Sequence, residues 1–416
     1  MDLSCTVYNA SSPVDTKSLA TRMWGYAQDF GPRAIWPPEV SENPNTFDPE
    51  GAMPNLHRSI VRLNEKEVME PMFQDMCEFY SAFLARIFYN HGIVSDTLVG
   101  WILQRYKMSD SAKYGMLATV LLIPSHYERL SHELDSIRLS SRTKLAGLIE
   151  IMNYECHASY LSHYYSHVAQ AAPLVEAIIG GDTIDFLRLR GERTFEVRCF
   201  AWCDILDSIS TSGPTKFKYV SNLEYTAQSS TGKDSGIELM LGFPNVLVVL
   251  LARTTALRHA QLLPQEIGLQ GFQLEQMIRD WQFHLVEAKE SLLRVARICA
   301  QEIWRHTGIL YVHHAVFKSD SSCSLVNYSV KNIIKLAATL KPGSTPDCFL
   351  AAPYFVAGSS AASQRDRYTL RSRLINCDNG GFVRNLASTL DELWKETDAT
   401  GRLTSWPESD FPRFVL

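Results

Sequence analysis

Two cysteines, Cys199 and Cys203, lie one helical turn apart and have the spacing of ligands for a soft metal ion. A structural zinc site needs four ligands. Both cysteines also fall on an apolar stripe with Trp202 and Leu206, where a free cysteine packs as a small hydrophobic side chain. We therefore predict that the pair belongs to the core and holds no metal ion.

A similar set follows at Cys299, Glu302 and His306, whose offsets of 0, 3 and 7 place all three on one helical face. These residue types could contribute to a zinc site, but they again fall short of four ligands. We expect core and capping roles for them. The sequence as a whole then predicts no metal site and no cofactor.

Histidines gather in one further segment, at His157, His163 and His167. His163 and His167 share a helical face and could serve as metal ligands or as a proton relay. No carboxylate stands at ligand spacing to orient their rings. Tyrosine and histidine rings are typical of the margin of an amphipathic helix, where the ring packs and the polar tip stays in water, and we predict that role.

Three segments partly match sequence motifs of enzymes, but each lacks a residue that its motif requires. The segment 231–234 resembles the end of a phosphate-binding loop, yet Ala227 and Asp234 stand where that loop needs Gly and Ser or Thr. The segment 132–136 begins like a zinc-protease helix but has Ser136 in place of the second histidine. The segment 357–361 lacks the second glycine of a nucleophile elbow. We predict no catalytic residues, and we expect Gly358 and Ser359 to permit close helix packing instead.

An all-helical chain with 11% aromatic residues could also be a terpene cyclase, which is the most serious enzyme alternative. Such enzymes hold diphosphate through magnesium ions, which prefer clustered carboxylate ligands. Asp204 and Asp207 share a helix but lack the adjacent acidic partner of an Asp-Asp-x-x-Asp cluster. The sequence therefore disfavours an enzyme.

The composition of the 416 residues is that of a globular protein, with 46% hydrophobic residues, 20% charged residues and a formal net charge of -5. Lys and Arg are scattered, so DNA binding by this chain alone is not expected. Nine cysteines at irregular spacings indicate an intracellular protein with reduced thiols. No signal peptide is recognisable, and the most apolar window, 239–252, is shorter than the about 20 residues that span a bilayer, so we expect no membrane segment.

Apolar residues recur with a helical period along most of the chain. Offsets of 0, 4, 7, 8, 11 and 14 from Phe195 predict a helix over 194–210 that ends at the Gly-Pro pair 213–214. A second stripe predicts a helix over 325–341 that ends at Pro342-Gly343. Further helices are predicted over 60–90, 94–108, 110–123, 140–170, 172–180, 245–263, 272–318 and 382–398.

The fold class that follows is all-α: an irregular multi-helix array or bundle with an irregular N-terminal arm. Residues 1–55 are rich in Pro, Asn, Asp and Ser and form the predicted arm, and 56–416 form the helical body. Too few apolar residues occupy 219–236 for packing, so an exposed loop is predicted there. No repeat of fixed period supports a solenoid.

Several packing segments follow one another in a recognisable order: 109–118, 195–207, 241–247, 304–314, 352–358, 367–374 and 393–394. In sequence and order they resemble the C-terminal regulatory domain of fungal zinc-cluster transcription factors. The central aromatic helix is 195–207, with Asp204 as its trailing acidic residue. Phe243 stands where the family has the cysteine of a Gly-Cys-Pro turn, while Gly242 and Pro244 preserve the turn.

The resemblance implies a nuclear regulator of transcription whose helical body pairs with a protein partner or with itself, or senses a small-molecule effector. The family's binuclear zinc cluster needs six cysteines within about thirty residues, and only Cys5 precedes Cys77. The sequence is then a regulator without its own cluster, a truncated gene model or a fragment. Besides a transcription regulator and a terpene cyclase, a helical scaffold without a role in transcription is the third possible function, because fold likeness does not fix function.

Overall fold

The computed structural model describes residues 58, 140–223, 238, 242–283, 291–377 and 381–401. The predicted arm over 1–55 and the predicted helices over 60–90, 94–108 and 110–123 lie outside these residues. Within the described part of the chain the structure consists of α-helices, short 3-10 turns, one π-helical turn and one pair of two-residue strands. The all-α prediction is confirmed.

The helices and strands have these bounds: α7 Ser141–Ala158, α8 Leu161–Ile179, β1 Thr183–Ile184, α9 Phe195–Thr211, β2 Lys218–Tyr219, α11 Asn245–Arg258, α12 Pro264–Asp280, α13 Ser291–Val312, α14 Ser324–Ala337, α15 Ala351–Ser359, α16 Gln364–Cys377 and α17 Gly381–Thr400. The π-helical turn His313–Phe317 follows α13, and the 3-10 turn Asp347–Phe349 precedes α15.

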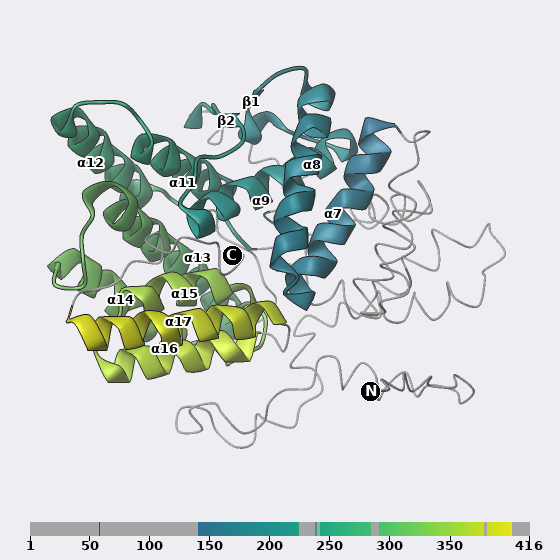
Figure 1. Ribbon diagram of the computed structural model, residues 1–416. Coiled ribbons are helices and arrows are strands. Elements are labelled where there is room, and N and C mark those ends of the chain that lie inside the picture. Colours follow the sequence, from purple (N-terminus) through teal and green to yellow (C-terminus); the bar gives the residue numbers. More distant parts are fainter. Residues whose placement is uncertain are drawn as a thin grey trace, which may run out of the picture.

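Helices α7 and α8 form an antiparallel pair at one end of the described body (Figure 1). The Ser140 side chain caps α7 by accepting a hydrogen bond from the Thr143 amide at 3.2 Å. The break between the predicted helices 140–170 and 172–180 lies instead at residues 159–160, where Ser159 takes a left-handed conformation. Pro173 is exposed inside α8, so water can satisfy the carbonyl that the proline leaves free.

Helix α9 confirms the predicted 194–210 helix, but its burial differs from a single apolar stripe. Helices α7, α8 and α11 all pack against it, so acidic and hydroxyl side chains are buried along with apolar ones. The predicted stripe members Cys199, Trp202 and Cys203 are only half-buried. The parallel strands β1 and β2 join the segments before and after α9, with Thr183 opposite Lys218.

The predicted exposed loop over 219–236 is only partly described. Its first residue, Tyr219, lies in β2 and is buried, because its ring packs into the core beneath α9. Residues 224–236 lie outside the described residues, so the loop prediction remains untested there.

The single helix predicted over 272–318 is in fact two helices and the π-helical turn. Pro264 occupies the first position of α12, where its missing amide costs nothing. The end of α12 is held by Arg305 of α13, which donates to the carbonyls of Ile278 and Trp281 at 2.7 and 2.6 Å. A side chain distant in sequence therefore fixes the break, which the helical period alone could not reveal.

Helix α14 confirms the second predicted stripe, although it ends at Ala337, before the predicted end at 341. Helices α15, α16 and α17 pack together, and Gly358 of α15 lies against Leu390 of α17. A Cβ there would lie 2.8 Å from Leu390 Cδ1, and the Gly358 carbonyl accepts a hydrogen bond from Trp394 Nε1 at 3.0 Å. The prediction that Gly358 permits close packing is confirmed.

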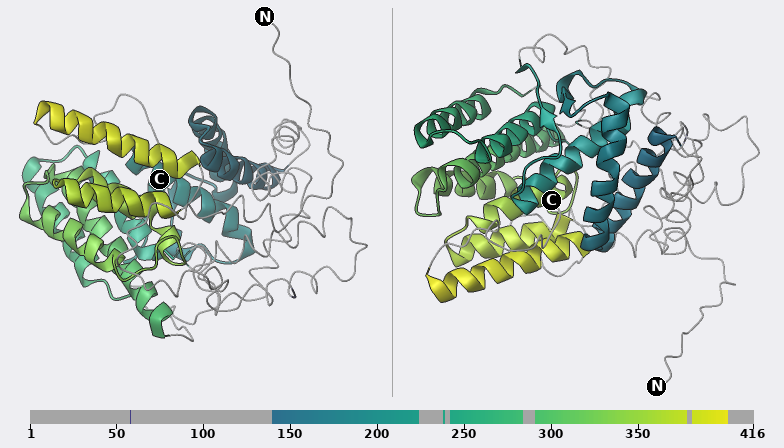
Figure 2. Two further views of the ribbon diagram at one scale, coloured as in Figure 1. Left: turned by 90° about the horizontal axis from the view of Figure 1, so that it is seen from below. Right: turned by 45° about the horizontal axis from the view of Figure 1, so that its top comes forward.

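Helix α13 runs through the middle of the described body and packs against α11, α12, α14 and α15 (Figure 2). Helix α12 lies at the edge farthest from α7 and α8, whereas α17 reaches back to contact α7 (Figure 1). The first and last helices of the described region are therefore neighbours.

Candidate functional site

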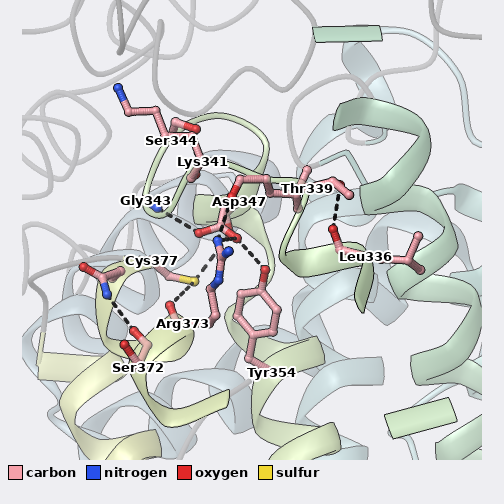
Figure 3. Close-up of polar contacts among 12 residues, drawn as sticks. Leu336, Thr339, Lys341, Gly343, Ser344, Asp347, Tyr354, Ser372, Arg373 and Cys377 are labelled. Carbon is pink, nitrogen blue, oxygen red and sulfur yellow. Dashed lines mark hydrogen bonds and ion pairs between the residues drawn. The ribbon is translucent and has the colours of Figure 1, made fainter. Parts of the chain in front are cut away.

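A fully buried polar cluster is centred on Asp347, between α14, α15 and α16 (Figure 3). The Asp347 carboxylate accepts hydrogen bonds from the Tyr354 hydroxyl and from the Gly343 amide, the latter at 2.8 Å. Arg373 of α16 completes an ion pair with Asp347 at 3.4 Å. Three separate segments therefore converge on one carboxylate.

Arg373 and Cys377 extend this cluster along the inner face of α16. The Arg373 guanidinium also donates to the Leu340 carbonyl at 2.9 Å, beyond the end of α14. The Cys377 thiol lies 3.4 Å from the Asp347 carbonyl oxygen (Figure 3). Because these side chains bond backbone groups of the 340–347 segment, they fix that irregular segment without a helix or a strand.

Burial raises the pKa of the Asp347 carboxyl, and Arg373, Tyr354 and the Gly343 amide oppose the rise. A carboxylate buried with a guanidinium needs its other lone pairs satisfied as well, and the tyrosine and the amide meet this need. The same contacts leave the carboxylate no free face for a substrate. The cluster holds α14, α15 and α16 in a defined arrangement, which is a positioning role.

The sequence did not point to this cluster. Asp347, Tyr354 and Arg373 belong to three elements, and their spacing matches no motif. The structure buries Arg373 together with its neighbours Ser372 and Leu374. An arginine amid buried positions calls for an internal acidic partner.

Asp204, which the family resemblance singles out, lies in the second half of α9 and holds the segment that follows the helix. Its carboxylate accepts hydrogen bonds from the Lys216 amide at 2.8 Å and from the Tyr219 hydroxyl at 2.8 Å. It also accepts from the Phe217 amide at 3.3 Å. Burial raises its pKa while these donors lower it. Asp204 thus secures the turn between α9 and β2.

Asp207 lies one turn further along α9 and is buried with fewer partners. The Tyr164 hydroxyl donates to its Oδ1 at 3.2 Å, and its Oδ2 has no hydrogen-bond partner in the structure. Burial therefore raises the pKa of Asp207 well above its usual value, and Asp204 adds to the rise. Asp204 and Asp207 do not form a diphosphate-binding cluster, since both face the interior.

The candidate ligand residues of the sequence prove to have separate surroundings. Cys299 accepts a hydrogen bond from Thr339 at 3.2 Å, and Glu302 pairs with Arg305 at 2.9 Å. His306 contacts Ser329 through Nδ1 at 3.3 Å. Among the described residues, no group of three or more His, Cys, Asp or Glu side chains is arranged to hold a metal ion.

In the histidine segment, His167 has a carboxylate partner that the sequence spacing did not indicate. The sequence offered no carboxylate partner at ligand spacing, yet His167 Nδ1 lies 2.9 Å from Glu155 Oε2. Glu155 belongs to α7 and is fully buried, so the antiparallel turn between α7 and α8 brings the two together. The pair links two helices, so a carboxylate 12 residues away in the sequence orients the His167 ring. The motif segments 132–136 and 231–234 lie outside the described residues.

The turn that carries Phe243 forms an aromatic cluster. The Phe243 ring is buried between Trp202 of α9 and Trp304 of α13, at centroid distances of 4.7 and 4.0 Å. The Phe243 ring therefore fills the space between α9 and α13. The turn itself is retained, with Gly242 at φ 67° and Pro244 immediately before α11.

No described helix combines the length and the apolar character needed to cross a membrane. Comparison with curated proteins finds no match, and neither does comparison with solved structures. One family model matches residues 103–410, which is more than half of the chain, and it describes a fungal specific transcription factor domain. The matched region contains every described helix from α7 to α17, together with the Asp347 cluster and the Phe243 turn. The chain therefore belongs to the family of the fungal specific transcription factor domain.

Proposed function

We propose that this chain is a nuclear regulator of transcription whose helical body acts by binding a protein partner or a metabolite. The family match over residues 103–410 is the observation that carries the proposal. The described side chains agree with it, because their polar clusters secure helices and turns instead of presenting reactive groups. We infer that the chain is a regulator and not an enzyme.

The terpene-cyclase alternative has no support from the described residues. Its magnesium ions would need carboxylates that face a substrate, whereas Asp204 is bonded to backbone amides and Asp207 is buried against Tyr164. The scaffold alternative differs from a regulator only in its effect on transcription. A transcription assay therefore separates the two.

The test joins the full chain to an unrelated DNA-binding domain in a fungal cell that carries a matching reporter. We expect reporter transcription to change, either directly or when a metabolite or partner is supplied. Trp304→Ala should abolish the effect, because removing a buried aromatic side chain from the Phe243 cluster costs about 3 to 5 kcal/mol. Trp202→Ala should act in the same direction but less strongly, since Trp202 is only half-buried.

The matched control is Tyr368→Ala, which removes an exposed aromatic side chain from α16. Its reporter effect should equal that of the unaltered chain at equal protein level. A fusion that is inert under every condition tried would refute the proposal. Turnover of a prenyl diphosphate in the presence of magnesium would instead move the chain to the cyclase class.

A further inference from the structure

Helix α12 carries an exposed stripe with the spacing of a coiled-coil seam. Gln265, Leu269, Phe272 and Gln276 follow one another at intervals of 4, 3 and 4 residues, and all four are exposed. Leu269 and Phe272 expose 61% and 63% of their surface. Intervals of 4 and 3 keep side chains on one face of a helix and allow a second helix to pack along them.

The opposite face of α12 already packs against the body. Leu274 and Ile278 are buried there, and a Cβ on Gly271 would lie 2.8 Å from Val316 of the π-helical turn. Helix α12 lies at an edge of the described body, with its outer side turned away from α11 and α13 (Figures 1 and 2). The Phe272 ring touches Phe317 of the π-helical turn at a centroid distance of 4.8 Å, but the stripe as a whole faces outward.

The four stripe residues of α12 are placed symmetrically about the midpoint between Gln270 and Gly271. Counting outward from that point pairs Leu269 with Phe272 and Gln265 with Gln276. When two identical helices pack antiparallel about a two-fold axis, each residue faces the partner's residue at the mirrored position. The symmetry therefore places an apolar side chain opposite an apolar one, and an amide opposite an amide.

Charge favours the same arrangement. A glutamine amide both donates and accepts hydrogen bonds, so Gln265 can donate across the axis to the Gln276 oxygen, while Gln276 Nε2 donates to Asp280 at 2.8 Å within α12. The whole chain has a net charge of -5, yet the stripe has none. Glu275 is buried on the inner face, where it pairs with Arg279 at 2.5 Å. Two copies of the stripe can therefore meet without opposing like charges.

We propose that the outer face of α12 pairs with α12 of a second copy of this chain, antiparallel and centred between residues 270 and 271. The pairing deepens the proposed function, because it identifies one partner of the helical body as the chain itself. The seam has two Leu269–Phe272 layers flanked by Gln265–Gln276 contacts. One helix of 17 residues supplies the contact, so the dimer is small and dissociates on dilution.

The experiment measures the association of the full purified chain by sedimentation equilibrium over a dilution series that reaches about 100 μM. The unaltered chain should form a reversible dimer. Leu269→Glu should weaken association about tenfold or more, because it buries two uncompensated carboxylates against Phe272. The matched control is Leu292→Glu on α13, where the leucine is 82% exposed and outside the stripe, and it should leave association unchanged.

A mixture of two variants tests the register. Phe272→Lys should also weaken self-association, because it buries an ammonium group against Leu269. In an equal mixture of the Leu269→Glu and Phe272→Lys chains, the introduced carboxylate faces the introduced ammonium group across the axis. The opposite half of the interface keeps its native Leu269–Phe272 layer. Association of the mixture should therefore exceed that of either variant alone.

The proposal is overturned if the unaltered chain is monomeric throughout the series, or if Leu292→Glu weakens association as much as Leu269→Glu does. A mixture no tighter than its components would overturn the register. These measurements use purified protein, so their failure is distinct from failure of the reporter assay. A dimer that dissociates with Leu269→Glu while the reporter fusion stays inert would uphold the pairing and refute the proposed function.

Discussion

Asp207 is a buried carboxyl group whose proton matters to the stability of the fold. Burial raises its pKa well above the value of about 3.9 that an aspartate has in an unfolded chain. The folded protein therefore keeps this proton to higher pH than the unfolded chain does. As the pH rises from about 4 through the folded pKa, the free energy of unfolding falls, because ionisation costs more in the folded state.

Asp207→Asn removes the ionisation and should remove this part of the pH dependence. Measured by urea unfolding at about pH 5 and about pH 8, the stability of the variant should decline less than that of the unaltered chain. Asp280→Asn serves as the control, since it makes the same substitution at an exposed carboxylate. Parallel profiles for the Asp207→Asn variant and the unaltered chain would contradict the prediction.

The Asp347–Arg373 ion pair provides a second test at the same scale. Arg373→Met should lower the free energy of unfolding by about 3 to 5 kcal/mol, because it leaves a buried carboxylate without its counter-charge. Adding Asp347→Asn removes that charge, while the asparagine oxygen can still accept from the Gly343 amide and its NH2 group can donate to the Tyr354 hydroxyl oxygen. The double variant should therefore be more stable than Arg373→Met alone. If the double variant is no more stable than Arg373→Met alone, the unpaired carboxylate charge is not the cause of the destabilisation.

The polar clusters were the part of the molecule least accessible from the sequence. Asp347 and Arg373 are 26 residues apart, and Glu155 and His167 are 12 apart, so only the paths of the chain between them decide that they meet. Phe243 was recognised at a turn, but its place between two tryptophans depends on the packing of α9 against its neighbours. The residue types in the sequence indicated which side chains could interact. Only the tertiary structure shows which of them are in contact.

At the scale of the helices, two glycines give opposite predictions for the same substitution. Gly358→Ala should lower the free energy of unfolding by about 1 to 3 kcal/mol, since its Cβ would press on Leu390 and separate α15 from α17. Gly268→Ala in α12 meets nothing within 4 Å and should raise stability by about 0.5 to 1 kcal/mol, because alanine favours a helix. Thermal unfolding of both variants checks the pair, and equal effects would contradict the packing at Gly358.

Helix boundaries followed from the sequence wherever local chemistry sets them. The apolar stripes and the breakers after them located α9 and α14 closely. The break at Ser159 escaped notice because a left-handed serine has no sequence signature as strong as glycine. The end of α12 was not predicted either, because the residue that caps it, Arg305, lies 24 residues after Trp281 in the sequence.

At the scale of the whole molecule, composition predicts how the isolated chain treats zinc and DNA. The cysteines are too widely spaced for a binuclear cluster, and the net charge of -5 disfavours phosphate contacts. We expect elemental analysis of the purified chain to find no stoichiometric zinc, and duplex DNA to bind only weakly at physiological salt. One or more zinc ions per chain would contradict this prediction.

The contact between α7 and α17 has a consequence for synthesis of the protein. Helix α17 begins about 240 residues after α7, which at about 5 to 20 residues per second is a delay of about 12 to 48 s on the ribosome. Helices α7 and α8 can pair early, because they are adjacent in the chain, but the surface of α7 that α17 covers stays open until the last described helix emerges. A nascent chain is therefore exposed to chaperones and proteases at α7 throughout that interval, and a chain that stops before Gly381 remains so.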